Sequence, residues 1–134
     1  MRVFVDSNIP MYVAGRDHPN RGPALRFLEA VRAGRIQACT SAEVLQEILF
    51  RYSGLGRTDL MGRVYDLFVE LCPAVFPVTL ADTDRAKSIL CTVSGISARD
   101  AVHAAVMLNN DVRDIATFDR GFELVPGLQR VALD

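Results

Sequence analysis

The sequence lacks the features of a disulfide-bonded, zinc-binding or membrane-spanning chain. Its 134 residues include only three cysteines, Cys39, Cys72 and Cys91, and no tryptophan. These cysteines lie far apart and form no Cys-x-x-Cys pair beside a histidine, which argues against a zinc site. Because their number is odd and no secretory signal accompanies them, we expect a protein of a reducing, cytoplasmic compartment.

Long apolar runs and an excess of one charge are also missing. The longest apolar runs fall well short of the roughly 20 residues that span a membrane, so we expect no membrane partner. Fifteen basic and 16 acidic residues give a net charge of −1, which neither supports nor excludes nucleic acid as a partner. Half of the residues are hydrophobic, and there are no repeats or low-complexity tracts. We therefore expect one globular domain over residues 1–134.

Hydrophobic patterning predicts strands that alternate with helices along the chain. The predicted strands cover 2–5, 35–40, 74–79 and 114–119, with a fifth candidate at 128–133. The predicted helices cover 8–15, 21–34, 41–54, 58–72, 81–95 and 97–110. Strands separated by helices pair in parallel through crossover connections, so we expect an α/β three-layer sandwich with a parallel sheet of four or five strands. Pro77 predicts that the third strand is short or at an edge.

Four acidic residues occupy positions at which a parallel sheet usually forms its site. Asp6 directly follows the first strand, Glu43 lies in the turn after the second, and Asp119 stands at the end of the fourth, after Asp-Ile-Ala-Thr. Asp100 begins the helix at 97–110. Sites in such folds form outside the carboxyl ends of the strands. We therefore expect these four carboxylates to converge at one edge of the sheet.

Each acid also has a purely structural interpretation. Thr40-x-x-Glu43 and Ser97-x-x-Asp100 fit capping boxes, and Asp6 and Asp119 are suitable turn residues. Helix caps alone would be scattered over both ends of the sheet, whereas all four acids map to the same end. The two interpretations are compatible, because a carboxylate that begins a helix still presents oxygen atoms to a ligand.

Four neighbouring carboxylates require a positive counter-charge to remain ionised together. Mg²⁺ or Mn²⁺ supplies it, since both cations take oxygen ligands and bind phosphates. Such a cation polarises a phosphoryl group and activates water. The four acids therefore predict metal-assisted hydrolysis of a phosphodiester.

Four segments resemble the PIN-domain family. They are "VFVDSN", "SAEVLQEIL", "SARDAVHAAVM" and "IATFDRGF", and together with the small size of the chain they are most similar to VapC-type toxins of bacterial toxin–antitoxin systems. The resemblance covers essentially the whole chain. It implies an Mg²⁺- or Mn²⁺-dependent ribonuclease acting on RNA, a homodimer, and an antitoxin protein that blocks the active site. It assigns the metal-binding and catalytic positions to Asp6, Glu43, Asp100 and Asp119.

Several neighbours of these acids have two interpretations. Ser7 either caps a helix or holds the Asp6 carboxylate, and Thr117 shares the strand face of Asp119 and suits a supporting role. His103 shares the helix face of Asp100, as a base, as a ligand, or, in the interpretation we prefer, as a partly buried helix residue. Arg99 is a candidate phosphate contact or a solubilising surface residue.

Other functions remain as alternatives. A structure-specific DNA nuclease would use the same chemistry, and a catalytically silent PIN-like binding module would use the same fold. A phospho-receiver also gathers acids at the end of an α/β sheet. It is disfavoured because Ser7 stands where a second acid is needed and Lys87 is the only lysine.

Overall fold

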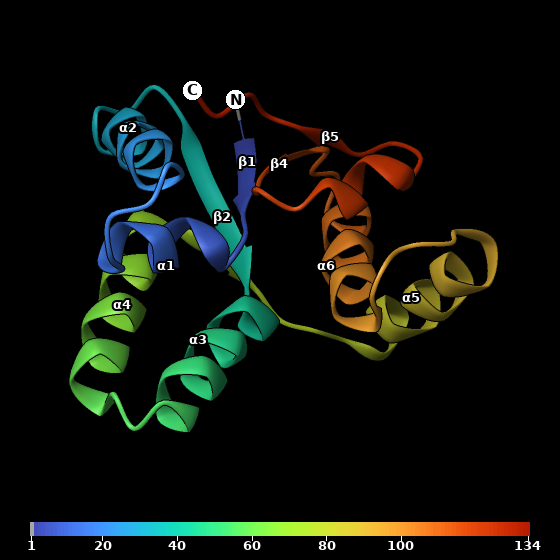
Figure 1. The fold of residues 1–134 in the computed structure, drawn as a ribbon. Helices are drawn as coiled ribbons and strands as arrows, with labels where there is room; N and C mark the ends of the chain where they lie inside the picture. Colours follow the sequence, from blue (N-terminus) through green and yellow to red (C-terminus); the bar gives the residue numbers. More distant parts are fainter. Residues whose placement is uncertain (1) are drawn as a thin grey trace.

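The computed structural model describes residues 2–134 as a five-stranded parallel sheet between two layers of helices (Figure 1). The sheet order is β3-β2-β1-β4-β5, and every neighbouring pair is parallel. The strands are β1 (Arg2–Val5), β2 (Gln37–Ser41), β3 (Ala74–Phe76), β4 (Asp114–Ala116) and β5 (Gln129–Arg130). The predicted α/β class is confirmed. The fifth strand forms over two residues only, and β3 is a three-residue edge strand that ends before Pro77.

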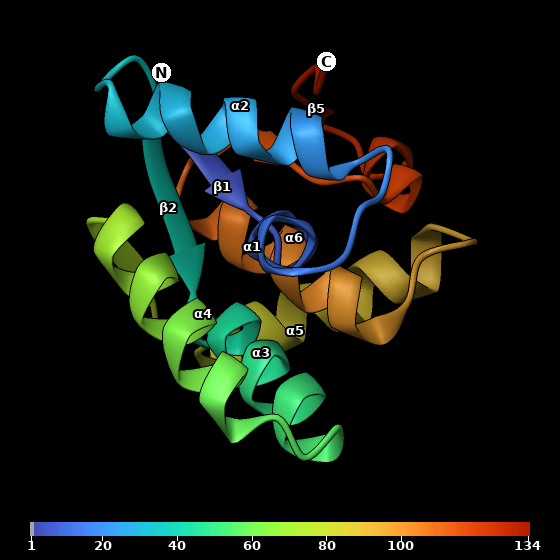
Figure 2. The same cartoon turned by 60° about the vertical axis from the view of Figure 1, so that its left-hand side comes forward.

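Six α-helices and one 3₁₀ helix, η1, flank the sheet in this part of the chain. They are α1 (Asn8–Ala14), α2 (Arg21–Arg32), α3 (Ala42–Gly54), α4 (Thr58–Leu71), α5 (Leu80–Thr92), α6 (Ala98–Asn109) and η1 (Arg120–Leu124). Helices α1, α2 and α4 lie on one side of the sheet and α5 and α6 on the other, with α3 packed against α4 (Figure 1). Figure 2 views α1 nearly along its axis, between α2 and the α3–α4 pair. Within residues 2–134, no helix combines the length and apolarity of a membrane span.

Local hydrogen bonds explain where the helices near the carboxyl edge begin. The Ser41 side chain accepts from the backbone N–H of Val44 and begins α3, and Ser97 accepts from the N–H of Asp100 and begins α6. The predicted capping box of Thr40 and Glu43 is wrong. The Thr40 hydroxyl instead donates to the Val5 carbonyl at 3.0 Å and ties β2 to β1, which moves the cap one residue along.

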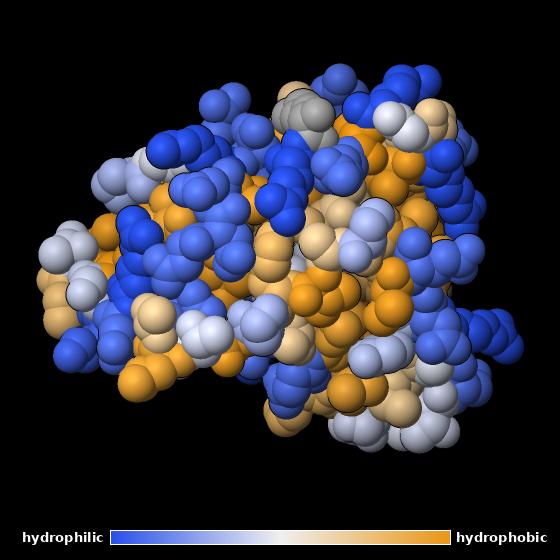
Figure 3. Space-filling view, turned by 180° about the vertical axis from the view of Figure 1, so that it is seen from behind, coloured by the Kyte–Doolittle hydropathy of each residue, from blue (hydrophilic) through white to orange (hydrophobic). Residues whose placement is uncertain are grey.

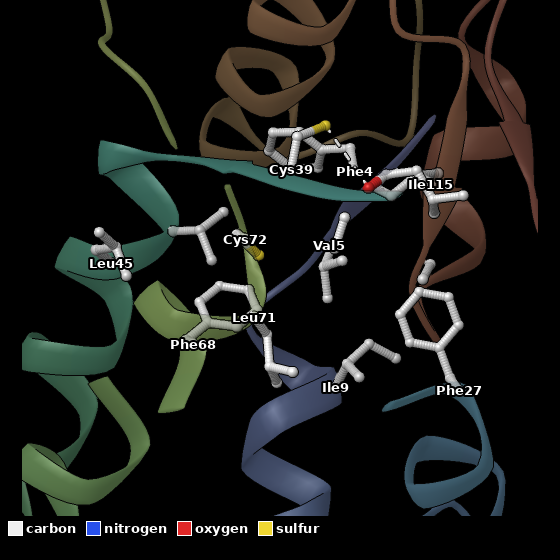
Figure 4. Close-up of a cluster of buried hydrophobic side chains, with 14 of the residues drawn as sticks. Phe4, Val5, Ile9, Phe27, Cys39, Leu45, Phe68, Leu71, Cys72 and Ile115 are labelled. Atoms are coloured by element: carbon white, nitrogen blue, oxygen red, sulfur yellow. Dashed lines mark hydrogen bonds between the residues drawn. The ribbon is translucent and has the colours of Figure 1, made fainter. Parts of the chain in front are cut away.

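The core holds the central strand β1 from both sides. Side chains alternate across a strand, so Phe4 faces His103 of α6 while Val5 faces the layer of α1 and α4. Figure 4 shows Phe4 with Cys39 and Ile115 on one side, and Val5 with Ile9, Phe27, Phe68 and Leu71 on the other. Each fully buried aliphatic or Phe side chain contributes roughly 1.5–3 kcal/mol. This packing fixes the carboxyl end of β1, and with it Asp6.

Candidate active site

A pocket of about 410 Å³ opens where the parallel strands end. Eight residues line it, namely Asp6, Ser7, Asn8, Glu47, Ser97, Arg99, Asp100 and Asp119. Three of the four predicted acids therefore come together here, from the end of β1, the first turn of α6 and the segment after β4. Glu43 does not line the pocket, and Glu47, one helical turn later on α3, does.

Asp6 is the most enclosed acid of the pocket, with 5% of its surface exposed. The backbone N–H of Ser7 donates to its Oδ1 at 2.7 Å, and the Thr117 hydroxyl donates to its Oδ2 at 2.6 Å. Burial raises the pKa of Asp6 above its ordinary value, although the positive charge of His103 and the bond from Thr117 oppose this. The structure therefore fixes the orientation of this carboxylate but makes its negative charge costly.

Thr117 joins three segments of the site. Besides donating to Asp6, its hydroxyl oxygen accepts from the Asn8 side-chain amide at 3.1 Å and from the backbone N–H of Asp119 at 3.0 Å. Asp119 is itself the cap of η1, since its Oδ1 accepts from the N–H of Gly121 at 2.8 Å. Asp119 thus plays both of the predicted roles, since it caps a helix and also lines the pocket.

Glu47 occupies the place that the sequence assigned to Glu43. The Ser7 hydroxyl donates to its Oε2 at 2.9 Å, and its Oε1 pairs with Nε2 of His103. Glu43 lies in the first turn of α3, where it complements the helix dipole. It stays outside the pocket because the second turn of α3, which carries Glu47, is the one that contacts Ser7. The sequence did contain a signal for Glu47 as an alternative to Glu43, since their four-residue spacing puts both glutamates on the same helix face.

The pKa of Glu47 reflects these contacts. Burial by itself would raise it, but the hydrogen bond and the charge of His103, together with the bond from Ser7, hold it below its ordinary value. The protein therefore stabilises the ionised form of Glu47 directly.

Asp100 shows the opposite effect. Burial, the adjacent carboxyl of Asp119 and the negative charge of Asp6 raise the pKa of Asp100 to about 7. The protein alone does not balance the charge of this pocket, and a cation bound there would stabilise the ionised form.

The pocket residues fit a hard divalent cation. Asp6, Glu47, Asp100 and Asp119 offer carboxylate oxygens, the ligand type that Mg²⁺ and Mn²⁺ prefer. The side-chain oxygen of Asn8 is also buried, and within residues 2–134 no hydrogen-bond donor reaches it. Ligand atoms of Asp6, Glu47 and His103 lie within 4.8 Å of one another.

A test of this charge imbalance is the pH dependence of stability without divalent cations. The pKa of Asp100 is 3.8 in the unfolded chain and about 7 in the folded one, so only the unfolded chain releases this proton in between. The contribution of protonated Asp100 to the free energy of unfolding is fully present below pH 3.8 and is lost as the pH rises to about 7. We expect the melting temperature in EDTA to fall across this range.

The Asp100→Asn variant should show a shallower fall and a higher melting temperature than wild type at pH 7.5. Mn²⁺ or Mg²⁺ should raise the melting temperature of wild type at this pH, because the cation binds the folded state. Thermal melts followed by circular dichroism at several pH values provide the measurement. Parallel pH profiles of wild type and Asp100→Asn would contradict the assignment.

Comparisons with known proteins identify the family. The family model of the PIN domain matches residues 3–128. The chain therefore belongs to the PIN-domain family. Its curated relatives within that family are VapC ribonucleases. Ribonuclease VapC13 of Mycobacterium tuberculosis is 40% identical over 130 residues, which cover 97% of this chain and 99% of that protein.

Solved structures agree on the fold. The crystal structure of Mycobacterium tuberculosis VapC20, a sarcin–ricin loop cleaving toxin, matches with a TM-score of 0.76 at 20% identity, over 94% of this chain and 96% of that one. A toxin–antitoxin complex from Klebsiella pneumoniae matches with a TM-score of 0.67 at 15% identity, over 98% of both chains. The resemblance to the PIN domain and to VapC-type proteins is thus confirmed.

Proposed function

We propose that this protein is an endoribonuclease that hydrolyses RNA phosphodiester bonds with Mg²⁺ or Mn²⁺ and acts as the toxin of a toxin–antitoxin pair. The observation that carries the proposal is the pocket in which Asp6, Glu47, Asp100 and Asp119 converge at the carboxyl end of the sheet. The VapC ribonuclease relatives support RNA as the substrate.

In this proposal Asp6, Glu47, Asp100 and Asp119 hold the cation, and Glu47 replaces Glu43 in the predicted set. When bound, the cation supplies Lewis-acid chemistry at the phosphate and favours ionisation of water. The chain supplies orientation. Thr117 and the N–H of Ser7 fix the Asp6 carboxylate, and the Ser7 hydroxyl fixes Glu47.

Arg99 supplies the phosphate contact in this proposal. It is the one basic residue among the eight that line the pocket. Its side chain is exposed on the first turn of α6, and within residues 2–134 it makes no hydrogen bond or ion pair with another side chain. A guanidinium group binds phosphate oxygens with two parallel hydrogen bonds.

The Arg99→Gln variant is expected to raise KM for RNA by roughly 10-fold with little change in kcat, because a charged hydrogen bond to bound substrate is lost. Arg63→Gln is the matched control, since Arg63 is exposed on α4 and outside the pocket. Steady-state cleavage of a labelled RNA measures both constants. Equal KM values for the two variants would show that Arg99 does not contact the substrate.

We further propose a cognate antitoxin protein, a homodimer and a cytoplasmic location. The toxin–antitoxin complex among the structural neighbours supports a protein partner. Leu49 and Phe50 are exposed on α3, and Leu55 directly after it. The face opposite to that of Figure 1 also carries broad apolar areas beside strongly polar ones (Figure 3). Exposed apolar areas of this kind are typical of protein–protein interfaces.

Expression in a bacterium that lacks the antitoxin tests the toxin function. Induction of the wild-type chain should arrest growth and degrade RNA, because no partner restrains the enzyme. Growth curves and RNA integrity are followed together, with the amount of soluble protein confirmed on the same samples. Normal growth with intact RNA would favour the catalytically silent binding module.

A further inference from the structure

His103 is a buried titratable residue to which the proposed mechanism assigns no role. We propose that it is a positioning residue, which holds the Glu47 carboxylate in the orientation that binds the cation and does not bind the cation itself. The inference rests on the proposed function, since it concerns how the same pocket is organised.

The surroundings of His103 leave its ring little freedom. The residue is 0% exposed on α6. Its ring lies near two aromatic rings, with centroid distances of 6.0 Å to Phe4 and 6.5 Å to Phe122. Nε2 contacts Oε1 of Glu47, and Nδ1 is buried with no hydrogen-bond partner within residues 2–134. Core packing thus directs one nitrogen atom toward a single carboxylate.

The position of the ring distinguishes positioning from ligation. His103 does not line the pocket, whereas Glu47 does. The carboxylate therefore stands between the imidazole and the space that a cation and a phosphate would fill. Although His103, Glu47 and Asp6 place ligand atoms within 4.8 Å of one another, Nε2 is already committed to Glu47.

Each oxygen atom of Glu47 has its own hydrogen-bond partner, His103 at Oε1 and Ser7 at Oε2. A glutamate side chain without such partners samples several rotamers, and it loses this conformational entropy when a cation binds, which weakens the binding. Partners that orient a metal-binding carboxylate typically change metal affinity or activity by about 10–100-fold when removed. His103 thereby prepares Glu47 before the cation arrives.

The test measures Mn²⁺ affinity from the electron paramagnetic resonance signal of free Mn²⁺, without RNA. His103→Leu removes the hydrogen bond and should weaken Mn²⁺ binding by about 10–100-fold. His103→Gln keeps an N–H donor near the position of Nε2 and should restore most of the affinity. Met107→Leu is the control, because Met107 is equally buried one turn later on α6. Circular dichroism melts establish that each variant is folded.

A double-mutant cycle with Glu47→Gln separates the proposed role from a general structural one. If His103 acts through Glu47, adding His103→Leu to Glu47→Gln should cause no further loss of Mn²⁺ affinity. Additive losses would overturn the inference, as would unchanged Mn²⁺ affinity in a folded His103→Leu variant. Coupling of a directly bound ¹⁴N nucleus in the pulsed spectrum of the wild-type Mn²⁺ complex would overturn it by identifying His103 as a ligand. Failure of folded wild type to bind Mn²⁺ would instead contradict the metal site of the proposed function.

Discussion

Replacing Asp6 by asparagine is expected to lower the rate of RNA cleavage by about 100-fold or more, because the buried carboxylate that we propose as a metal ligand loses its charge. The fold should survive. Asparagine has nearly the same shape, and its side-chain oxygen still accepts from the N–H of Ser7. Only the bond that the Thr117 hydroxyl donates to Oδ2 is lost, because an amide nitrogen does not accept a hydrogen bond. Since burial disfavours the charge of Asp6, the metal-free variant should melt at or above the temperature of wild type.

The matched control for this experiment is Asp66→Asn, which removes the same charge from an exposed position on α4. Cleavage rates of labelled RNA and thermal melts in EDTA are compared for both variants and wild type. An Asp6→Asn protein that cleaves RNA as fast as Asp66→Asn would remove Asp6 from the active site.

The second large effect concerns the two glutamates of α3. Glu47→Gln should lower cleavage by about 10–100-fold or more, because Glu47 lines the pocket and its ionised form is stabilised by His103. Glu43→Gln should stay within about 2-fold of wild type, as it only weakens a helix-dipole contact. Both variants carry the same substitution on the same helix, one turn apart. Each variant is therefore the control for the other.

Initial rates at saturating Mn²⁺ and over a Mn²⁺ titration provide this comparison. The titration matters because excess cation should recover part of the lost activity if Glu47 is a ligand. Loss of activity in Glu43→Gln with a nearly normal Glu47→Gln would restore the original assignment from the sequence and discard the one from the pocket.

The class of the fold was predictable from the sequence because the signals were local and repeated. Apolar strands alternate with amphipathic helices, which indicates a parallel sheet. Pro77 removes a backbone donor, and β3 is accordingly a short edge strand. Exact boundaries were harder to predict. Only two residues of 128–133 pair with β4, because strand length depends on neighbours that are remote in the sequence.

The candidate site was partly predictable for a similar reason. Asp6 directly follows β1 and Asp119 lies three residues after β4, so the rule for parallel sheets places both at the carboxyl edge. Of the two glutamates on one face of α3, the sequence did not indicate that Glu47 rather than Glu43 lines the pocket, because that depends on which helical turn lies against Ser7 and His103. The contacts of Ser7 and His103 with Glu47 determine that choice, and they join residues 40 and 56 positions apart.

The most direct test of the central claim is cleavage of RNA by the purified chain without any partner protein. A labelled single-stranded RNA and the DNA of the same sequence are incubated with wild type or Asp6→Asn, in Mg²⁺, in Mn²⁺ or in EDTA. We predict internal cleavage of the RNA by wild type with either cation or both, its loss in EDTA, and its return when the cation is restored. Folded wild-type protein that leaves RNA intact in both cations, or that cleaves it equally well in EDTA, would contradict the account.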